Sequence, residues 1–165
     1  MSSIMSLSIA LESLLTQKDK ETHLGDWLTI SQDRINQFAE ATDDYQWIHV
    51  DLEKARQQSP YGTTIAHGYL TLSLIVTLTK TNQSDDKTTN FEGLKMAINY
   101  GLNKVRFPAP VKVGERIRAR TILKEVDVVK DCLQLTREVT IEIENSEKPA
   151  CVAETVSRLY FHNTN

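Results

Sequence analysis

Three side chains in the middle of the chain are of types that move protons in enzymes. Asp44 and His49 lie five positions apart, and a second histidine follows at His67. Carboxylates and imidazoles act as general acids and bases when their surroundings adjust their pKa values. Trp47 and Ile48 would shield the first two from water and so shift both pKa values. The pattern indicates a proton-transfer pair; two ordinary polar residues on a surface loop are the alternative.

The spacing of Asp44 and His49 also constrains the backbone between them. On an ideal helix, residues five positions apart point about 140° away from each other, so the two side chains could not converge. The run Thr42-Asp43-Asp44 is typical of the end of a helix. We therefore expect the pair to lie on a turn that follows a short helix.

The second histidine introduces the most apolar part of the chain. A helix from His67 to about Lys80 would be apolar nearly all the way round, through Tyr69, Leu70, Leu72, Leu74, Ile75, Val76 and Leu78. Such a helix must be enclosed by the rest of the protein. Gly68 allows a ligand to approach the backbone, where free N–H groups can stabilise an oxyanion. Proton carriers near this helix end suit the addition or removal of water beside a thioester carbonyl.

The elements around this helix are indicated by capping signals and by alternation. Residues 1–22 are poorly patterned, with a hint of a short amphipathic helix. Ser31 should cap a helix that runs to about Ala41, with Ile30 and Ile35 as a hydrophobic staple. A further helical turn or two at 51–57 and a polar loop at 81–90 are expected. Strands are expected at Gly25–Ile30, Leu94–Phe107, Glu115–Asp127, Leu133–Ile143 and Ala150–Phe161.

These elements predict a fold class. The late strands are joined by short turns and should therefore be antiparallel. Along Leu133–Ile143 apolar side chains alternate with polar ones, and only Arg137 interrupts the apolar set. About five antiparallel strands with one apolar helix predict an α+β fold, in which a curved sheet wraps around a central helix. With no internal repeat and no linker, we expect a single domain over residues 1–165.

The overall charge limits the classes of ligand. The formal net charge of −3 and the isoelectric point near 5.8 argue against a nucleic-acid-binding protein, which needs a basic excess. Arg116, Arg118 and Arg120 form a local exception, since their spacing places all three on one face of a strand. They are either a solvated strand face or a binding strip for a charged ligand such as a nucleotide phosphate.

The two cysteines and the hydropathy pattern bear on the compartment. The hairpin expected around Asn145–Pro149 pairs Cys151 with about Ile143 and not with Cys132, so we expect no disulfide. No secretory signal is evident, and no stretch of about 18 apolar residues could span a membrane. We therefore expect a cytoplasmic protein.

Several segments of the chain strongly resemble the MaoC-like dehydratase family, the (R)-specific enoyl-CoA hydratases, and within it the NodN-like branch. The resemblance extends over residues 25–160. It is carried by ATDDYQWIHVD at 41–51, YGTTIAHGYLTL at 61–72, AINYGLNKVRFP at 97–108 and CVAE at 151–154. It implies a hot-dog fold, in agreement with the helix-and-sheet prediction.

The resemblance also implies roles for individual residues. Asp44 and His49 match the catalytic pair of the family, and Gly68 matches the glycine whose N–H faces the thioester carbonyl. The family motif G-D-x-N-P-x-H is altered here, because Gln46 replaces the Asn and Trp47 replaces the Pro. Further substrate contacts are expected from Gln46, Trp47, His67 and Tyr69. Val76 stands where some members place a serine, and whether Ser73 takes that role is left open.

The expected activity is the reversible hydration of trans-2-enoyl-CoA to (R)-3-hydroxyacyl-CoA. Acyl-CoA hydrolysis on the same fold and non-catalytic binding of an acyl thioester are the alternatives. No cofactor is expected, and no metal, because His67 and His162 have no ligand spacing with His49. The resemblance further implies a homodimer, in which the three arginines would meet the CoA phosphates.

Overall fold

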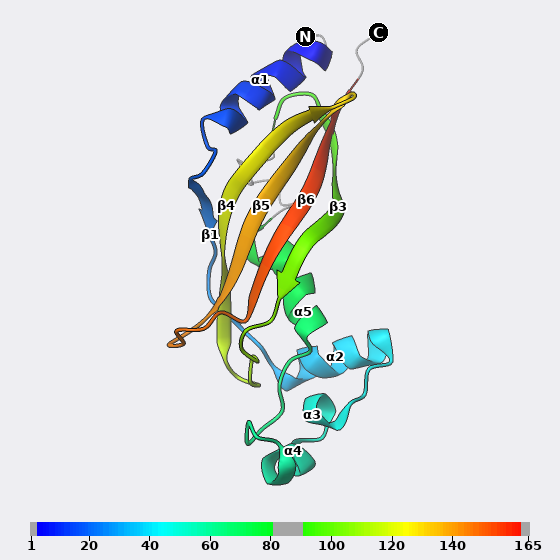
Figure 1. The fold of residues 1–165 in the computed structure, drawn as a ribbon. Helices are drawn as coiled ribbons and strands as arrows, with labels where there is room; N and C mark the ends of the chain where they lie inside the picture. Colours follow the sequence, from blue (N-terminus) through cyan, green and yellow to red (C-terminus); the bar gives the residue numbers. More distant parts are fainter. Residues whose placement is uncertain (1–2, 81–90, 163–165) are drawn as a thin grey trace.

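The computed structural model describes residues 3–80 and 91–162, so the expected loop at 81–90 lies outside the described residues. Helices and strands occur in mixed order along the chain (Figure 1). Their bounds are α1 Ser3–Leu15, β1 Glu21–Leu24, β2 Leu28–Thr29, α2 Gln32–Thr42, α3 Trp47–Val50, α4 Leu52–Gln58, α5 Gly68–Ser73, α6 Ile75–Leu78, β3 Leu94–Arg106, β4 Arg116–Val129, β5 Cys132–Ile143 and β6 Cys151–Phe161.

The strands form one antiparallel sheet with the order β1-β4-β5-β6-β3, and β2 also pairs with β4. The sheet has six strands where about five were expected, because β1 and β2 replace the single strand predicted at 25–30. The β5–β6 hairpin pairs Cys151 with Ile141, two positions from the expected Ile143. A shift of two keeps every side chain on its predicted face.

The split of the first strand has a steric cause at Gly25. Its N–H donates to the carbonyl of Ala119 at 2.8 Å, as in a strand. At the same point the chain passes the end of α6, and a Cβ on Gly25 would lie 2.3 Å from the carbonyl oxygen of Leu78. The backbone therefore approaches the helix end where a side chain could not fit, and regular pairing resumes only at β2.

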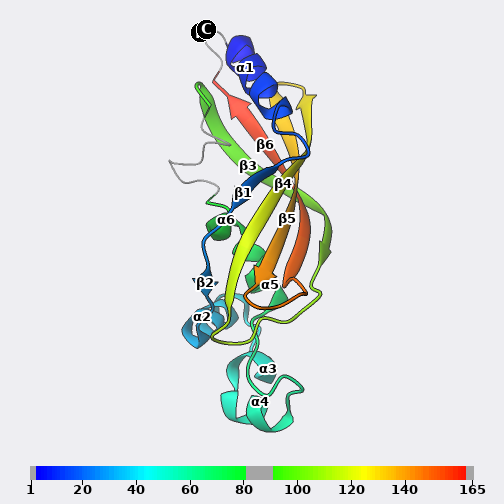
Figure 2. The same cartoon turned by 90° about the vertical axis from the view of Figure 1, so that its left-hand side faces the viewer.

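The central helix is formed by α5 and α6, which lie against one face of the sheet (Figure 2). Leu74 joins them, and its N–H still bonds to the carbonyl of Leu70 at 3.0 Å. Leu70, Leu74 and Leu78 are buried. Full enclosure of this helix was expected, but Tyr69 is 72% exposed, so the described residues do not enclose the helix completely. The sheet covers one side of the helix only.

The helix-facing side of the sheet carries two separate hydrophobic clusters. In one, α5 and α6 pack on Val139, Ile141 and Ala153, together with Ile30 and Ile35 of the predicted staple. In the other, α1 packs through Ala10 and Leu14 on the far ends of the strands, at Leu133, Leu135, Leu159 and Phe161. Residues 1–22, which are poorly patterned, thus contribute a helix of their own to the core.

Helices α2, α3 and α4 lie together at the end of the sheet where α5 begins (Figure 1). The hydroxyl of Ser31 accepts a hydrogen bond from the N–H of Arg34, which confirms the predicted N-cap of α2. Asp43 ends the helix with a left-handed backbone at φ 57°. The chain then turns back across this end of the molecule, which positions Asp44 and α3 near the first residues of α5.

The arginines at 116, 118 and 120 do not form an open binding strip. Arg116 pairs with Glu144 at 2.8 Å, and Arg118 with Glu142 at 2.7 Å. Arg120 pairs with both Glu142 and Glu21. Because each guanidinium already faces a carboxylate, the structure favours a solvated strand face. The proposed meeting of this face with CoA phosphates is therefore withdrawn.

The two cysteines are free and buried at opposite ends of β5 and β6, which confirms the absence of a disulfide between them. Among the described helices, none is long and apolar enough to cross a membrane.

Candidate active site

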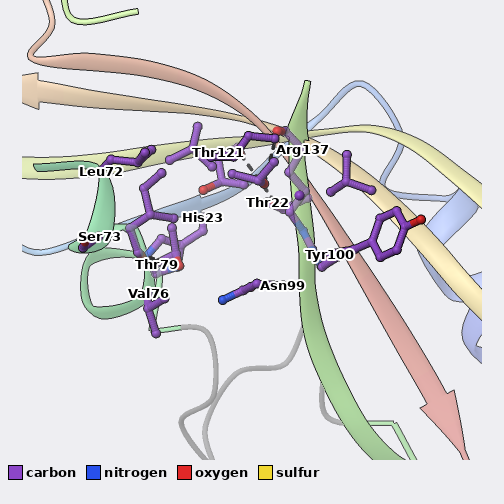
Figure 3. A pocket seen from close by; sticks show the side chains of 17 residues that line it. Thr22, His23, Leu72, Ser73, Val76, Thr79, Asn99, Tyr100, Thr121 and Arg137 are labelled. Atoms are coloured by element: carbon purple, nitrogen blue, oxygen red, sulfur yellow. Dashed lines mark hydrogen bonds between the residues drawn. The ribbon is translucent and has the colours of Figure 1, made fainter. Parts of the chain in front are cut away.

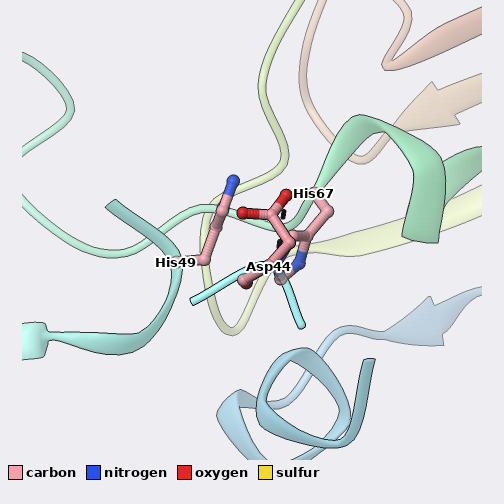
Figure 4. A group of neighbouring side chains, drawn as sticks. All are labelled: Asp44, His49 and His67. Carbon is pink, nitrogen blue, oxygen red and sulfur yellow. Dashed lines mark hydrogen bonds and ion pairs between the residues drawn. The ribbon is translucent and has the colours of Figure 1, made fainter. Parts of the chain in front are cut away.

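Asp44, His49 and His67 come together at the N-terminal end of α5 (Figure 4). Asp44 follows the end of α2, His49 belongs to α3 and His67 is the N-cap residue of α5. One side-chain O or N atom from each lies within 4.8 Å of the others. The prediction that both members of the pair lie on a turn after α2 holds for Asp44 only, because His49 lies in the short helix α3. Three short segments thus bring the residues together.

The imidazole of His49 is held in one orientation by the backbone. Its Nδ1 lies 2.7 Å from the carbonyl oxygen of Ile65, and because a carbonyl only accepts, Nδ1 carries the proton. In the neutral ring Nε2 then has a lone pair. Burial lowers the pKa of His49, as does the neighbouring His67, against the raising effects of the Ile65 carbonyl and Asp44. The side chain is therefore suited to accept a proton at neutral pH.

His67 supports the other member of the pair. Its Nε2 lies 3.0 Å from the main-chain carbonyl oxygen of Asp44, to which it donates, and 4.0 Å from the Asp44 carboxylate. Its ring stacks on His49 with centroids 3.8 Å apart and contacts Phe38 at 5.1 Å. Nδ1 of His67 is buried without a hydrogen-bond partner in the described part of the chain. His67 thus fixes the position of Asp44 and packs against His49.

The two members of the pair differ in their exposure. His49 is 7% exposed, whereas the side chain of Asp44 is 50% exposed. Shielding from water was expected for both groups and is found for the histidine only. Asp44 escapes burial because it lies beyond the end of α2, where none of the described elements covers it. Its carboxylate is open to solvent on one side and faces the imidazoles on the other.

Gly68 is the first residue of α5, so its N–H has no acceptor inside the helix. A Cβ at this position would lie 3.2 Å from the ring of Phe107, closer than most such contacts. Tyr69 packs edge-on against the same ring, with centroids 6.2 Å apart. Phe107 therefore forms one wall beside the start of α5. Because Gly68 has no side chain, space remains between this wall and the backbone.

The other expected substrate contacts lie around this centre. Gln46 is exposed and precedes α3, and its N–H points to Asp44 Oδ1 at 3.4 Å. Trp47 is half-buried, with the Lys54 ammonium 5.1 Å above its ring. Ser73 lies one turn into the helix, but its hydroxyl donates to the carbonyl of Tyr69 at 2.7 Å.

Sequence reasoning missed the residues that hold α3 in place. Gln32 donates to the main-chain carbonyl of His49 at 2.8 Å and accepts from the hydroxyl of Thr64 at 2.6 Å. Thr64 is fully buried, and the N–H of Ile65 bonds to the carbonyl of Ile48. A glutamine in the first turn of a surface helix gives no signal of this role, because its partners are distant in sequence.

The geometry corrects one argument made from spacing. His67 was discounted as a metal ligand because of its distance from His49 in sequence, yet the two rings are neighbours and Asp44 is close to both. The rings are nearly parallel, at 25° to each other. Ring nitrogens bind metals in the plane of the ring at about 2.0–2.1 Å, so one ion between stacked rings would require a ring to turn. The arrangement therefore suits proton transfer better than metal binding.

Comparisons with known proteins agree with this geometry. The family model of the MaoC-like domain matches residues 15–145. The 3-hydroxyacyl-thioester dehydratase Z of Mycobacterium tuberculosis is 52% identical over 134 residues, covering 81% of this chain and 84% of that protein. Nodulation protein N of Rhizobium leguminosarum bv. viciae is 39% identical over 160 residues, covering 93% and 92%.

A solved structure supports the fold. The R-hydratase PhaJ1 of Pseudomonas aeruginosa superposes with a TM-score of 0.64 at 20% identity, covering 89% of this chain and 84% of that one. The predicted hot-dog fold is thereby confirmed. The matched family is one of dehydratases, so the expected enzyme class, a hydro-lyase, is confirmed as well. From its sequence, its fold and the matched relatives, the chain belongs to the MaoC-like dehydratase family.

Proposed function

We propose that this protein is an (R)-specific enoyl-CoA hydratase that converts trans-2-enoyl-CoA reversibly into (R)-3-hydroxyacyl-CoA. One observation carries the proposal: a half-exposed carboxylate and a buried imidazole with its Nδ1 proton fixed meet at the first turn of an apolar helix. A binding protein would need no such proton carriers. The named relatives, a thioester dehydratase and an R-hydratase, support the reaction class.

In the proposed reaction Asp44 and His49 hold one water molecule between them. The water oxygen forms the bond to C3 of the enoyl group while one of the pair takes its proton. The pair delivers a proton to C2, so that the elements of water add across the double bond. We assign the acid and the base to the pair as a unit, because strongly interacting groups titrate together. No cofactor or metal takes part in this scheme.

The surrounding residues would position the pair and the substrate. The Gly68 N–H is proposed to bind the thioester oxygen and to stabilise the negative charge that develops there. His67 positions Asp44 by donating a hydrogen bond to the main-chain carbonyl of Asp44. Gln46, Trp47 and Tyr69 are proposed to contact the thioester arm, since all three lie on segments next to this centre.

We further propose that the active form is a homodimer. Strand β3 has 13 residues, and in the described parts of the chain it pairs only with β6, so its outer edge is open. Its alternate residues Met96, Ile98, Tyr100 and Leu102 are all more than 40% exposed. A long apolar edge strand is normally covered by another chain. Sedimentation at assay concentration checks this, and a fully active monomer would exclude it.

A spectrophotometric assay tests the activity directly. Crotonyl-CoA should lose its enoyl-thioester absorbance in the presence of the protein, and the product should be oxidised only by an (R)-specific 3-hydroxyacyl-CoA dehydrogenase. Release of free CoA without hydration would indicate a thioesterase instead. Binding of the thioester without either reaction would indicate a non-catalytic binding protein. The two buried free thiols support a cytoplasmic location, which we propose with the function.

A further inference from the structure

A cavity of about 280 Å³ lies between the central helix and the sheet (Figure 3). Its lining includes Leu72, Ile75 and Val76 of the helix and residues 99–102 of β3. If the thioester lies at the start of α5 as proposed, this cavity has room for the acyl chain. The described residues that line it include none from α2, from α3 or from the turn at Asp44. The catalytic pair must therefore be positioned by contacts outside the cavity.

Helix α3, which carries His49, has only four residues and is too short to be stable by itself. Two of its carbonyl groups accept hydrogen bonds from other segments. The N–H of Ile65 donates to the carbonyl of Ile48 at 3.0 Å. The side-chain amide of Gln32, at the start of α2, donates to the carbonyl of His49 at 2.8 Å. The place of the imidazole thus depends on these two donors and on its own bond to the Ile65 carbonyl.

The orientation of the Gln32 amide follows from its partners. Its nitrogen donates to the carbonyl of His49 and, at 2.9 Å, to the side-chain oxygen of Asn36. Its oxygen accepts from the hydroxyl of Thr64 at 2.6 Å. A flipped amide would place its oxygen against the His49 carbonyl, where two acceptors would repel each other. The three partners therefore fix the amide in the orientation that donates to His49.

Thr64 connects this amide to the start of the central helix. It is fully buried, and its main-chain carbonyl accepts from the N–H of Val113 at 3.0 Å. The chain then continues directly through residues 64–68, so that Gly68 begins α5 four positions after the contact with Gln32. Gln32 is therefore bonded both to the segment that carries the imidazole and to the segment that leads to the helix start.

We propose that Gln32 and Thr64 are positioning residues that hold the imidazole of His49 in place for proton transfer. This inference rests on the proposed hydratase function and adds two residues to it. Neither residue is expected to touch the substrate, because Thr64 is fully buried and the Gln32 amide already has three partners. A displacement of about 1 Å can cost about 10²-fold in rate. The effect of both residues should therefore appear in kcat and not in KM.

Exchanging one hydroxyl tests the bond between Thr64 and Gln32. Thr64→Val keeps the shape of the side chain and removes the hydroxyl, whereas Thr64→Ser keeps the hydroxyl and removes a methyl group. Thr64→Val should lower kcat for crotonyl-CoA by about tenfold or more, and Thr64→Ser by less than about threefold, with KM nearly unchanged in both. If only packing mattered, Thr64→Ser would be the slower variant, because the site is fully buried. That order would overturn the inference.

Removing the amide tests Gln32 itself. Gln32→Met is similar in length, and its kcat should fall by about 10–10²-fold. Asn36→Ala is the matched control, because Asn36 is exposed and accepts from the same nitrogen, and its kcat should not change. Added to His49→Ala, Gln32→Met should lower the residual turnover by less than about twofold, since it acts through His49. Equal losses with and without His49 would overturn the inference.

Proton exchange tests the positioning of His49 without any turnover. The Nδ1–H of His49 is buried and bonded to the Ile65 carbonyl, so it should exchange slowly with water in nuclear magnetic resonance spectra. Its signal is assigned by its absence in His49→Gln. The exchange should be about tenfold or more faster in Gln32→Met and unchanged in Asn36→Ala. Unchanged exchange in folded Gln32→Met would overturn the inference.

The two kinds of measurement separate this inference from the proposed function. Circular dichroism establishes the fold of each variant, and Thr64→Val provides the same tests if Gln32→Met does not fold. Hydration of crotonyl-CoA at the wild-type rate by folded Gln32→Met and Thr64→Val would overturn the inference and leave the proposed function standing. A wild type that hydrates no enoyl thioester, but whose His49 exchange responds to Gln32→Met, would support the positioning of His49 and reject the hydratase activity.

Discussion

The candidate active site and the arginine face of β4 both gather charged or polar side chains from neighbouring segments, but in opposite ways. On β4, each arginine lies against a carboxylate of β1, of β5 or of Glu144 just after β5, so the charges satisfy one another. In the active site, His49 and His67 each use one ring nitrogen on a main-chain carbonyl. Side chains fixed by the backbone keep their remaining atoms for a ligand, whereas side chains fixed by one another do not.

This difference predicts where substitutions will act. Changes in the active site should affect turnover with little effect on folding. Changes on the arginine face should affect folding slightly and turnover not at all. Four experiments test the contrast, beginning with the largest expected effect.

The first concerns the catalytic pair. Asp44→Asn and His49→Ala should each lower the turnover of crotonyl-CoA by at least about 10²-fold, because each removes a proton carrier. The double variant should lose much less than the product of the two factors, since both residues act on one water. Asp43→Asn is the matched control, because Asn accepts the left-handed backbone at this position. Near-normal hydration by either folded single variant would show that the site is elsewhere.

The second experiment isolates the N–H of Gly68. Both Gly68→Ala and Gly68→Pro add atoms beside Phe107, so both should be slowed by crowding. Only proline also removes the N–H, and it is tolerated as the first helical residue after an extended His67. The proline variant should turn over about 10²–10³-fold more slowly than the alanine variant.

Circular dichroism establishes that both Gly68 variants are folded. The difference between them should lie mainly in kcat, because the developing oxyanion uses the N–H more than the ground-state carbonyl does. Equal turnover of the folded alanine and proline variants would place the oxyanion at another donor.

The third experiment uses pH. The pKa of His49 is lowered below its ordinary value near 6.5, so below pH 6.5 the unfolded chain binds more protons at this site than the native protein. Stability from this group should therefore be complete above about pH 6.5 and should decrease as the pH falls below it. His49→Gln should flatten this part of the curve of unfolding free energy against pH. An unchanged slope in the variant would show that another group controls it.

The fourth experiment should show the smallest effect. Glu142 is desolvated, but its hydrogen bonds to Arg118 and Arg120 outweigh this and lower the pKa of its carboxyl group. These groups are partly exposed, so Glu142→Gln should cost no more than about 1 kcal/mol of unfolding free energy, and less at high salt. Crotonyl-CoA turnover should be unchanged. A large loss of turnover in this variant would mean that the arginine face is coupled to the reaction.

The sequence predicted the long elements well, because their signals are local. The cap at Ser31, the alternation along β5 and the apolar run after His67 each reflect short-range periodicity. The division of the first strand could not be foreseen, since it depends on the contact between Gly25 and Leu78 across 53 positions of the chain. The partial exposure of the central helix was also missed, because periodicity shows which side chains avoid water but not how many chains cover them.

For the candidate site, the sequence identified Asp44, His49 and Gly68 as a group, and the structure places the first two beside each other at the start of α5. The contribution of His67 was underestimated, because its bond to the main chain of Asp44 leaves no trace in the sequence. The role of Gln32 in holding α3 was missed for the same reason. Spacing along the chain indicates which residues could react, but distant contacts decide which residues hold them.

The two buried thiols lie at opposite ends of the sheet, so their chemical labelling would report local opening of the fold at each end. Cys151 belongs to the central-helix cluster, and Cys132 lies beside Leu133 of the α1 cluster. Cys132 lies nine positions before Ile141, the partner of Cys151, which corresponds to about 30 Å along β5. Burial raises the pKa of Cys151 to about 11, so it reacts only after exposure. The labelling rates of the two thiols would therefore show which end of the sheet opens first.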